Sequence, residues 1–136
     1  MVILDSTVWI AYLDTKDFRH TKVHSLYHSL QDEILIPEYV MSEVCSVLAS
    51  KNKKETADAF IEIAESNADI EILPSSPQFF KDVRVAFQKL RSKHFSFVDV
   101  SLMVLSSLYP VITLDVKLDK FLKKKISNIA LKRIDA

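Results

Sequence analysis

The chain has 136 residues, of which 49% are hydrophobic, so it is long enough and apolar enough to bury one core. Its 18 basic and 18 acidic residues give a formal net charge of zero, which argues against a polycation that coats nucleic acid through charge alone. The chain contains no glycine, and this excludes the glycine-rich phosphate loops of the P-loop and dinucleotide-binding types.

Strands and helices are predicted to alternate along the chain. Short apolar runs predict strands over residues 2–5, 33–37, 70–74 and 110–115 and near 129–132. Helices are predicted over residues 7–13, 19–31, 38–50, 54–67, 77–92 and 97–108, and a further short helix precedes the last strand. This alternation predicts an α/β fold with one domain over residues 1–136, in which a central parallel sheet of about four to five strands is flanked by helices on both faces.

The sequence also indicates where the protein works. The single cysteine, Cys45, excludes an internal disulfide and a zinc site built from cysteines, and its apolar context is typical of a small core residue. The most apolar run, residues 97–112, is short and interrupted by Asp99 and Pro110, so no membrane-spanning segment is expected. Because the first apolar run meets Asp5 at once and follows no basic residue, it does not read as a signal peptide. We therefore expect a cytoplasmic protein that makes no contact with a membrane.

A chain without glycine needs other residues to close its helices. Asparagine tolerates the left-handed conformation that often ends a helix. Asn52, Asn67 and Asn128 are therefore the candidates for this task.

Four acidic residues lie where a carboxylate is costly. Asp5 and Asp115 each follow a strand that consists mainly of Val, Ile and Leu, and Glu43 and Asp99 lie within apolar helical runs. In an open parallel sheet, sites form beyond the carboxyl ends of the strands, where Asp5 and Asp115 both lie. Each acid also has a purely structural interpretation, because Asp5, Asp99 and Asp115 could cap the helices beside them and Glu43 could face solvent.

Together, the four acids favour a metal site. Carboxylates close to a core destabilise the fold unless they are paired or bound to a cation. If all four converge at one edge of the sheet, their repulsion either raises their pKa values or demands divalent cations. Ligand sets made only of oxygen atoms suit Mg²⁺ or Mn²⁺, and such ions can polarise a phosphodiester and activate water. This is the chemistry of a metal-dependent nuclease.

Four segments resemble the PIN domain family, in particular the VapC-like ribonuclease toxins of toxin–antitoxin pairs. They are MVILDSTVWIAYL at the start, IPEYVMSEVCSVL in the first third, FSFVDVSLMVLS late and VITLDVKLDKF near the end. Their order and spacing fit the family over nearly the whole chain. The resemblance implies that the catalytic, metal-binding acids are Asp5, Glu43, Asp99 and Asp115.

The resemblance also assigns supporting residues. Thr7 and Thr113 match positions where the family often keeps a hydroxyl near the acids. The family often has a further acid after the fourth motif, and Asp119 is the candidate here, although it is not in the commonest register. The late motifs of the family often contain small residues such as glycine, which this chain lacks.

The function that the resemblance implies is a Mg²⁺- or Mn²⁺-dependent endoribonuclease that acts as a toxin. Its implied partners are an RNA substrate, a cognate antitoxin that blocks the active-site groove, and a second copy in a homodimer. The alternative is a catalytically degenerate PIN-like domain that serves as a scaffold or binds RNA. A phosphatase or receiver domain fits less well, because Thr7 stands where such proteins need a second early acid.

Basic residues are candidates for RNA binding, since the acids themselves repel phosphate. The best placed are Arg84, Lys89, Arg91 and Lys93, which precede Asp99. The lysine-rich stretches 51–54 and 123–125 are more typical of solvated helix ends.

Three histidines, His20, His24 and His28, share one helix face because they are spaced by four residues. Such spacing can hold a metal ion, but no carboxylate is placed to join them, so a solvent-exposed helix face is favoured.

Overall fold

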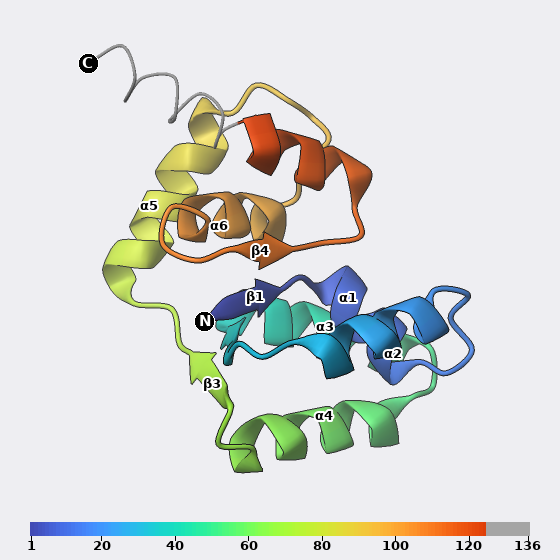
Figure 1. Ribbon diagram of the computed structural model, residues 1–136. Coiled ribbons are helices and arrows are strands. Elements are labelled where there is room, and N and C mark those ends of the chain that lie inside the picture. The colour runs from blue at the N-terminus through green and yellow to red at the C-terminus, as the bar shows by residue number, and fades with distance from the viewer. Residues whose placement is uncertain (125–136) are drawn as a thin grey trace.

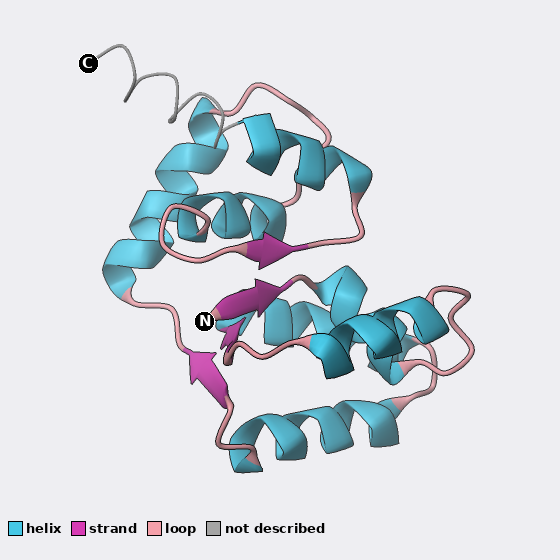
Figure 2. Cartoon of the chain, in the orientation of Figure 1, coloured by secondary structure: helices cyan, strands magenta, loops and turns pink. Residues whose placement is uncertain are grey.

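A computed structural model of the chain describes residues 1–124, and the strand predicted near residues 129–132 lies outside this part. Within it, parallel strands form a sheet in the order β3-β2-β1-β4. Helices flank the sheet on both faces, as Figures 1 and 2 show, so the predicted α/β architecture is confirmed. The strands are β1 (Val2–Leu4), β2 (Ile34–Pro37), β3 (Ile70–Leu73) and β4 (Val111–Ile112).

The helices begin and end close to their predicted bounds. They are α1 (Ser6–Leu13), α2 (His20–Ser29), α3 (Glu38–Ser50), α4 (Lys54–Ser66), α5 (Pro77–Lys89) and α6 (Phe97–Leu105), and residues 116–124 are also helical. In Figure 1, α5 and α6 lie on the β4 side of the molecule, whereas α2 and α4 lie on the opposite side. None of the helices within residues 1–124 is long and apolar enough to cross a membrane.

The core forms around the central strand β1. Ile3 of β1 pairs with Leu35 of β2 on one side and with Val111 of β4 on the other, and it is fully buried. Trp9 anchors the helical layer next to this strand: it is 1% exposed, and its ring centroid lies 4.9 Å from that of Phe60 in α4. Burial of these side chains stabilises the arrangement that holds the end of β1, and with it Asp5, in place.

The last strand is shorter than predicted, because side-chain hydroxyls take over the hydrogen bonds of the backbone. The prediction of a strand over 110–115 is wrong beyond Ile112. The amide of Leu114 donates to the hydroxyl of Thr7 at 3.1 Å, and the amide of Asp115 donates to the hydroxyl of Thr113 at 3.0 Å. Amides bound in this way cannot join the ladder of the sheet, so the chain leaves it at Thr113.

The predictions about how the helices end have different outcomes. Asn52 follows α3 with a φ of 59°, so it does close that helix in the left-handed conformation. Asn67 ends α4 in an extended conformation with a φ of −84°, so its predicted role is wrong. Asn128 lies outside the described residues. Helix α6 ends at Leu105, three residues before its predicted end.

Candidate active site

The strand order places a crevice at the end of β1. The first crossovers carry the chain from β1 to β2 and β3, and the next one returns it to the other side of β1, where β4 lies. Open parallel sheets bind ligands outside the carboxyl ends of the strands at such a reversal. Asp5 directly follows β1, and Asp115 follows β4 by three residues. These two predicted residues therefore lie at the point where the topology favours a site.

Asp5 is the most buried acid of this edge, with 2% of its surface exposed. Its Oδ1 accepts a hydrogen bond from the amide of Ser6 at 2.7 Å, which caps α1. Its Oδ2 accepts from the hydroxyl of Thr113 at 2.7 Å and from that of Thr7 at 3.1 Å. The structure thus brings both predicted hydroxyls to the carboxylate, and together they fix its orientation.

Ser6 joins a second acid to Asp5. Its hydroxyl contacts Oε1 of Glu43 in α3 at hydrogen-bonding distance and lies 3.3 Å from Oδ1 of Asp5. Ser6 is buried and Glu43 is partly buried, so this bridge joins α1 to α3 at the border of the core. Sequence analysis did not single out Ser6. Only its place next to Asp5 at the start of a helix could have indicated a role, because Glu43 is 37 residues away.

The capping roles that were the structural alternatives for Asp99 and Asp115 are also correct, whereas Glu43 is partly buried rather than turned to solvent. The carboxylate of Asp99 accepts a hydrogen bond from the amide of Ser96 at 3.0 Å, while the Ser96 hydroxyl accepts from the amide of Asp99, which completes a capping box at α6. Oδ1 of Asp115 accepts from the amides of Lys117 and Leu118 and so caps the helix over residues 116–124. Capping and convergence are compatible here, because each cap turns a helix start toward the same edge.

The charges of these acids affect the pKa values of two of them, Glu43 and Asp99. Burial raises the pKa of Glu43, and the nearby charges of Asp5 and Asp99 raise it further, whereas the Ser6 hydroxyl opposes the change. Burial likewise raises the pKa of Asp99, with added repulsion from Asp5 and Asp115. Like charges in a common, partly dehydrated region produce this effect. The four acids, which come from separate parts of the sequence, therefore lie near enough to one another for their charges to interact, and we call them the acid cluster.

Nothing within the described residues neutralises this cluster. None of the four acids forms an ion pair there, although four other aspartates do: Asp14, Asp17, Asp58 and Asp119. Within residues 1–124, no three Asp, Glu, His or Cys side chains lie close enough together to hold one metal ion. Carboxylates that repel one another stay apart unless a cation lies between them. The donor set consists of oxygen atoms, which is the chemistry that Mg²⁺ and Mn²⁺ prefer.

Asp119, the predicted additional acid, lies in a different environment. Its carboxylate pairs with the ammonium of Lys123 one helical turn later, at 2.8 Å, and its side chain is 39% exposed. An exposed pair of this kind is typical of a helix surface. The structure thus connects Asp119 to Lys123, whereas it couples the other four acids to one another.

Comparison with known proteins agrees with this architecture. Residues 2–123 match the model of the PIN domain. The chain belongs to the PIN domain family. Its fold is similar to the crystal structure of Mycobacterium tuberculosis VapC20, a sarcin–ricin loop cleaving toxin, with a TM-score of 0.78. The sequences are 17% identical over 88% of this chain and 94% of that one, so the likeness is one of fold. Comparison with curated proteins gives no match.

The basic residues predicted to bind RNA lie on the surface of this PIN domain. Arg84 and Lys89 belong to α5, and Arg91 and Lys93 lie in the loop that leads to α6. All four are exposed, and none forms an ion pair within residues 1–124. Their charges remain available to an anionic ligand.

The predicted histidine face of α2 is mostly exposed. His24 and His28 are exposed, with ring centroids 4.3 Å apart, and Nδ1 of His20 lies 2.9 Å from the backbone oxygen of Ala11. Within the described residues they belong to no group that could hold a metal ion. The structure shows this helix face largely exposed to solvent, as predicted.

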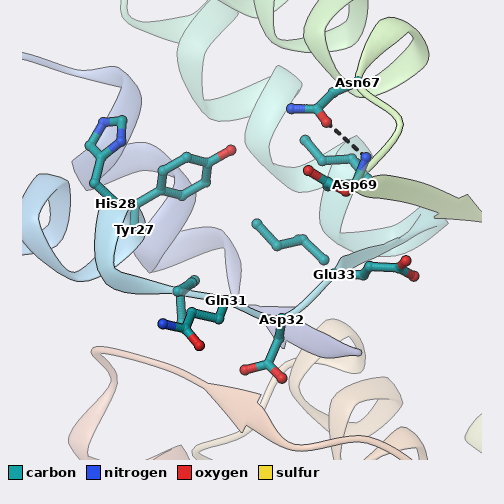
Figure 3. A pocket seen from close by; sticks show the side chains of 10 residues that line it. Tyr27, His28, Gln31, Asp32, Glu33, Asn67 and Asp69 are labelled. Carbon is teal, nitrogen blue, oxygen red and sulfur yellow. Dashed lines mark hydrogen bonds between the residues drawn. The ribbon is translucent and has the colours of Figure 1, made fainter.

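A pocket of about 280 Å³ lies at the opposite edge of the sheet (Figure 3). Glu33 and Asp69 line it at the amino ends of β2 and β3, and Asp32 lies beside them. The side chain of Asn67 turns back to accept a hydrogen bond from the amide of Asp69 at 2.8 Å. Because its acids lie at the other ends of parallel strands, this pocket is separate from the cluster around Asp5.

Proposed function

We propose that this PIN domain protein is a Mg²⁺- or Mn²⁺-dependent endoribonuclease that hydrolyses phosphodiester bonds of RNA. The observation that carries the proposal is the acid cluster at the reversal of the sheet. Asp5 is buried, is held by three hydroxyl-bearing residues and forms no ion pair within the described residues. A fold that keeps such a cluster free of lysine and arginine leaves its charge for a cation from solution.

In this proposal Asp5, Glu43, Asp99 and Asp115 hold the divalent ion. When bound, such an ion polarises the phosphodiester and lowers the pKa of a water molecule that attacks it. Ser6 keeps Glu43 beside Asp5, and Thr7 and Thr113 hold Asp5 through its Oδ2 atom. Asp119 is proposed as an additional acid that would first have to leave Lys123.

The proposed partners follow from the fold and from the exposed charge. VapC20, whose fold is similar, is a sarcin–ricin loop cleaving toxin, and we infer a toxin role for this chain as well. A cognate antitoxin would then cover the acid cluster, and the active form would be a homodimer. Arg84, Lys89, Arg91 and Lys93 would contact phosphates of the RNA substrate, since each is exposed and unpaired within residues 1–124.

The alternative is a catalytically inactive PIN domain that binds RNA or serves as a scaffold. One observation favours it: Asp5, Asp99 and Asp115 all cap helices, so a structural task alone could retain them. Glu43 separates the two proposals, because it lies inside α3 and caps nothing.

The test is RNA cleavage by the purified full chain in Mg²⁺ or Mn²⁺, with and without EDTA. We expect a pool of structured RNAs to be cut by the wild type, and the cutting to stop with EDTA and in Asp5→Asn and Asp99→Asn. Asp32→Asn is the matched control, because it removes an exposed acid at the opposite edge of the sheet. Equal cleavage by all variants would reveal a contaminating nuclease and refute the assignment of the acids. Loss of metal-dependent thermal stabilisation in Asp5→Asn and Asp99→Asn, but not in Asp32→Asn, would locate the metal even where the RNA target is absent.

A further inference from the structure

The pocket at the amino ends of β2 and β3 combines aromatic, apolar and polar walls (Figure 3). Tyr27 and His28 of α2 form the aromatic wall, and their ring centroids lie 5.5 Å apart. Apolar surface comes from Leu30, Ile34 and Ile70. The volume of about 280 Å³ is close to the lower end of the range for small-molecule sites. The pocket therefore has the size and the lining of a site for a small ligand with an apolar part.

The charge around the pocket is negative. Two helices end there, since Leu30 and Asn67, which directly follow α2 and α4, both line it. The end of a helix carries a partial negative charge. Glu33 and Asp69 add carboxylates, and neither forms an ion pair within residues 1–124. Because no lysine or arginine is found among the described residues that line the pocket, its charge favours a cationic ligand.

Polar groups converge inside the pocket. Figure 3 shows the hydroxyl of Tyr27 and the carboxylate of Asp69 facing each other across it. Burial raises the pKa of Tyr27, and the charges of Tyr12 and Asp69 raise it further. Asn67 holds this side of the pocket in place, because its side-chain oxygen accepts a hydrogen bond from the amide of Asp69 at 2.8 Å. A cation between Tyr27 and Asp69 would contact both an aromatic ring and a carboxylate.

The sheet sets the spacing of the two acids. Ile34 pairs with Ile70, so Glu33 and Asp69, which each come one residue earlier, precede adjacent strands. Neighbouring strands are about 5 Å apart, a length that three or four methylene groups span. A metal ion would use only the oxygen atoms of this lining and leave its apolar and aromatic surface without a role. A linear amine uses all three kinds of wall.

We propose that this pocket binds a polyamine, an aliphatic chain with ammonium groups separated by methylene groups. Glu33 and Asp69 would bind ammonium groups, and Tyr27 would lie against one of them. The methylene groups would cover the apolar residues of the pocket, as the stems of long cationic side chains cover apolar surface. The proposal does not rest on the nuclease function, because the pocket lies at the opposite edge of the sheet from the acid cluster.

The experiment measures the binding of spermidine to the full chain by isothermal titration in EDTA at low ionic strength. Glu33→Gln with Asp69→Asn, the pocket variant, should weaken binding about tenfold, as the loss of two exposed ion pairs predicts. Glu62→Gln with Glu71→Gln is the matched control, because it removes the same charge from exposed acids that do not line the pocket. We expect the control variant to bind spermidine as the wild type does.

A second probe separates a shaped site from general attraction between charges. Hexaamminecobalt(III) has the same positive charge as spermidine at neutral pH but has no carbon chain. Spermidine should bind the wild type about tenfold more tightly than this compact ion, because burial of its methylene groups adds to the attraction. The pocket variant should lose most of this preference.

Three results would overturn the proposal. Spermidine affinity that is unchanged in the pocket variant excludes the pocket. Equal weakening in both double variants, or equal affinity of the wild type for both probes, assigns binding to the overall charge of the surface. Weakening by Asp5→Asn in place of the pocket variant assigns spermidine to the acid cluster.

A measurement on the wild type keeps the test valid if circular dichroism shows that the pocket variant has lost its helices. Spermidine should shift the amide resonances of Asp69 and Ile70 in a titration followed by nuclear magnetic resonance. Shifts confined to residues around Asp5 and Glu43 would contradict the proposal. RNA cleavage tests the nuclease function separately, and its absence would leave spermidine binding at the pocket unaffected.

Discussion

The two ends of α1 each carry a buried aspartate, and the two carboxylates have different partners. Asp14, at the end of the helix, is 7% exposed and pairs with the ammonium of Lys53 at 3.1 Å. This hydrogen bond holds the pKa of Asp14 below its ordinary value. Asp5, at the start of the helix, is 2% exposed and is contacted by hydroxyls and an amide.

Part of the difference comes from the helix itself. A carboxylate is favoured at the positive start of a helix and disfavoured at its negative end, so Asp14 needs a cation more than Asp5 does. The helix start does not explain Glu43, which lies beside Asp5 inside α3 and has a raised pKa. Asp14 is paired with a cation of its own chain, whereas the acids around Asp5 form no ion pair within residues 1–124.

The largest expected effect comes from neutralising each of these two aspartates in turn. Asp5→Asn should lower RNA cleavage at least about a hundredfold, since loss of even an outer partner of a metal ligand costs ten- to a hundredfold. Asp14→Asn should leave cleavage within a few-fold of the wild type. Initial rates at saturating Mn²⁺ compare the two variants. A similar loss in both would mean that the cleavage defect reflects folding rather than the site.

The next effect concerns the bridge between Asp5 and Glu43. Ser6→Ala removes the hydroxyl that contacts Glu43, and we expect Mn²⁺ affinity to fall about tenfold because the second carboxylate is no longer oriented. Isothermal titration measures the affinity. Ser101→Ala is the matched control, since Ser101 is fully buried and its hydroxyl donates only to the backbone oxygen of Val98 in α6. Equal losses in both variants would remove the special role of Ser6.

A smaller effect is expected on stability at the other end of α1. Asp14→Asn leaves Lys53 without its partner and should lower the free energy of unfolding by about 1 kcal/mol. Because the pKa of Asp14 is lowered, this contribution is present above its ordinary value of 3.8 and disappears as the pH falls through the lowered pKa. Urea unfolding of wild type and variant at neutral and acidic pH tests both statements. A difference that persists in strong acid would contradict the role of the charge.

The smallest effect is the pH dependence caused by the acid cluster in metal-free protein. Because the pKa of Glu43 is raised, the folded state binds its proton more tightly than the unfolded state does. Stability should therefore decrease as the pH rises from the ordinary value of 4.5 through the raised pKa. Glu43→Gln should reduce this decrease and raise the melting temperature slightly at neutral pH in EDTA. A Glu43→Gln protein that melts below the wild type in EDTA would show that the carboxylate stabilises the fold.

Local patterns in the sequence were sufficient to place most elements. Apolar runs ending at Asp5 and Pro37 marked β1 and β2, and helical spacing placed α3 over Glu38–Ser50 with its predicted bounds. Alternation of strands and helices then implied the parallel sheet, whose carboxyl edge had to carry Asp5 and Asp115. These features depend on near neighbours in the chain or on a general rule of α/β topology, so they can be read without coordinates.

Tertiary structure decided the contacts that cross long stretches of sequence. The bridge from Ser6 to Glu43 and the bond from Thr113 to Asp5 join residues 37 and 108 positions apart, and no local pattern encodes which hydroxyl meets which carboxylate. The same contacts end β4 at Ile112, because Thr7 and Thr113 take amides that a longer strand would have used. Asp14 pairs with Lys53, whereas Asp5 contacts hydroxyls. This difference likewise depends on which elements pack at each end of α1. Local chemistry therefore determined where the acids stand along the chain, and packing determined which of them remain without a cation.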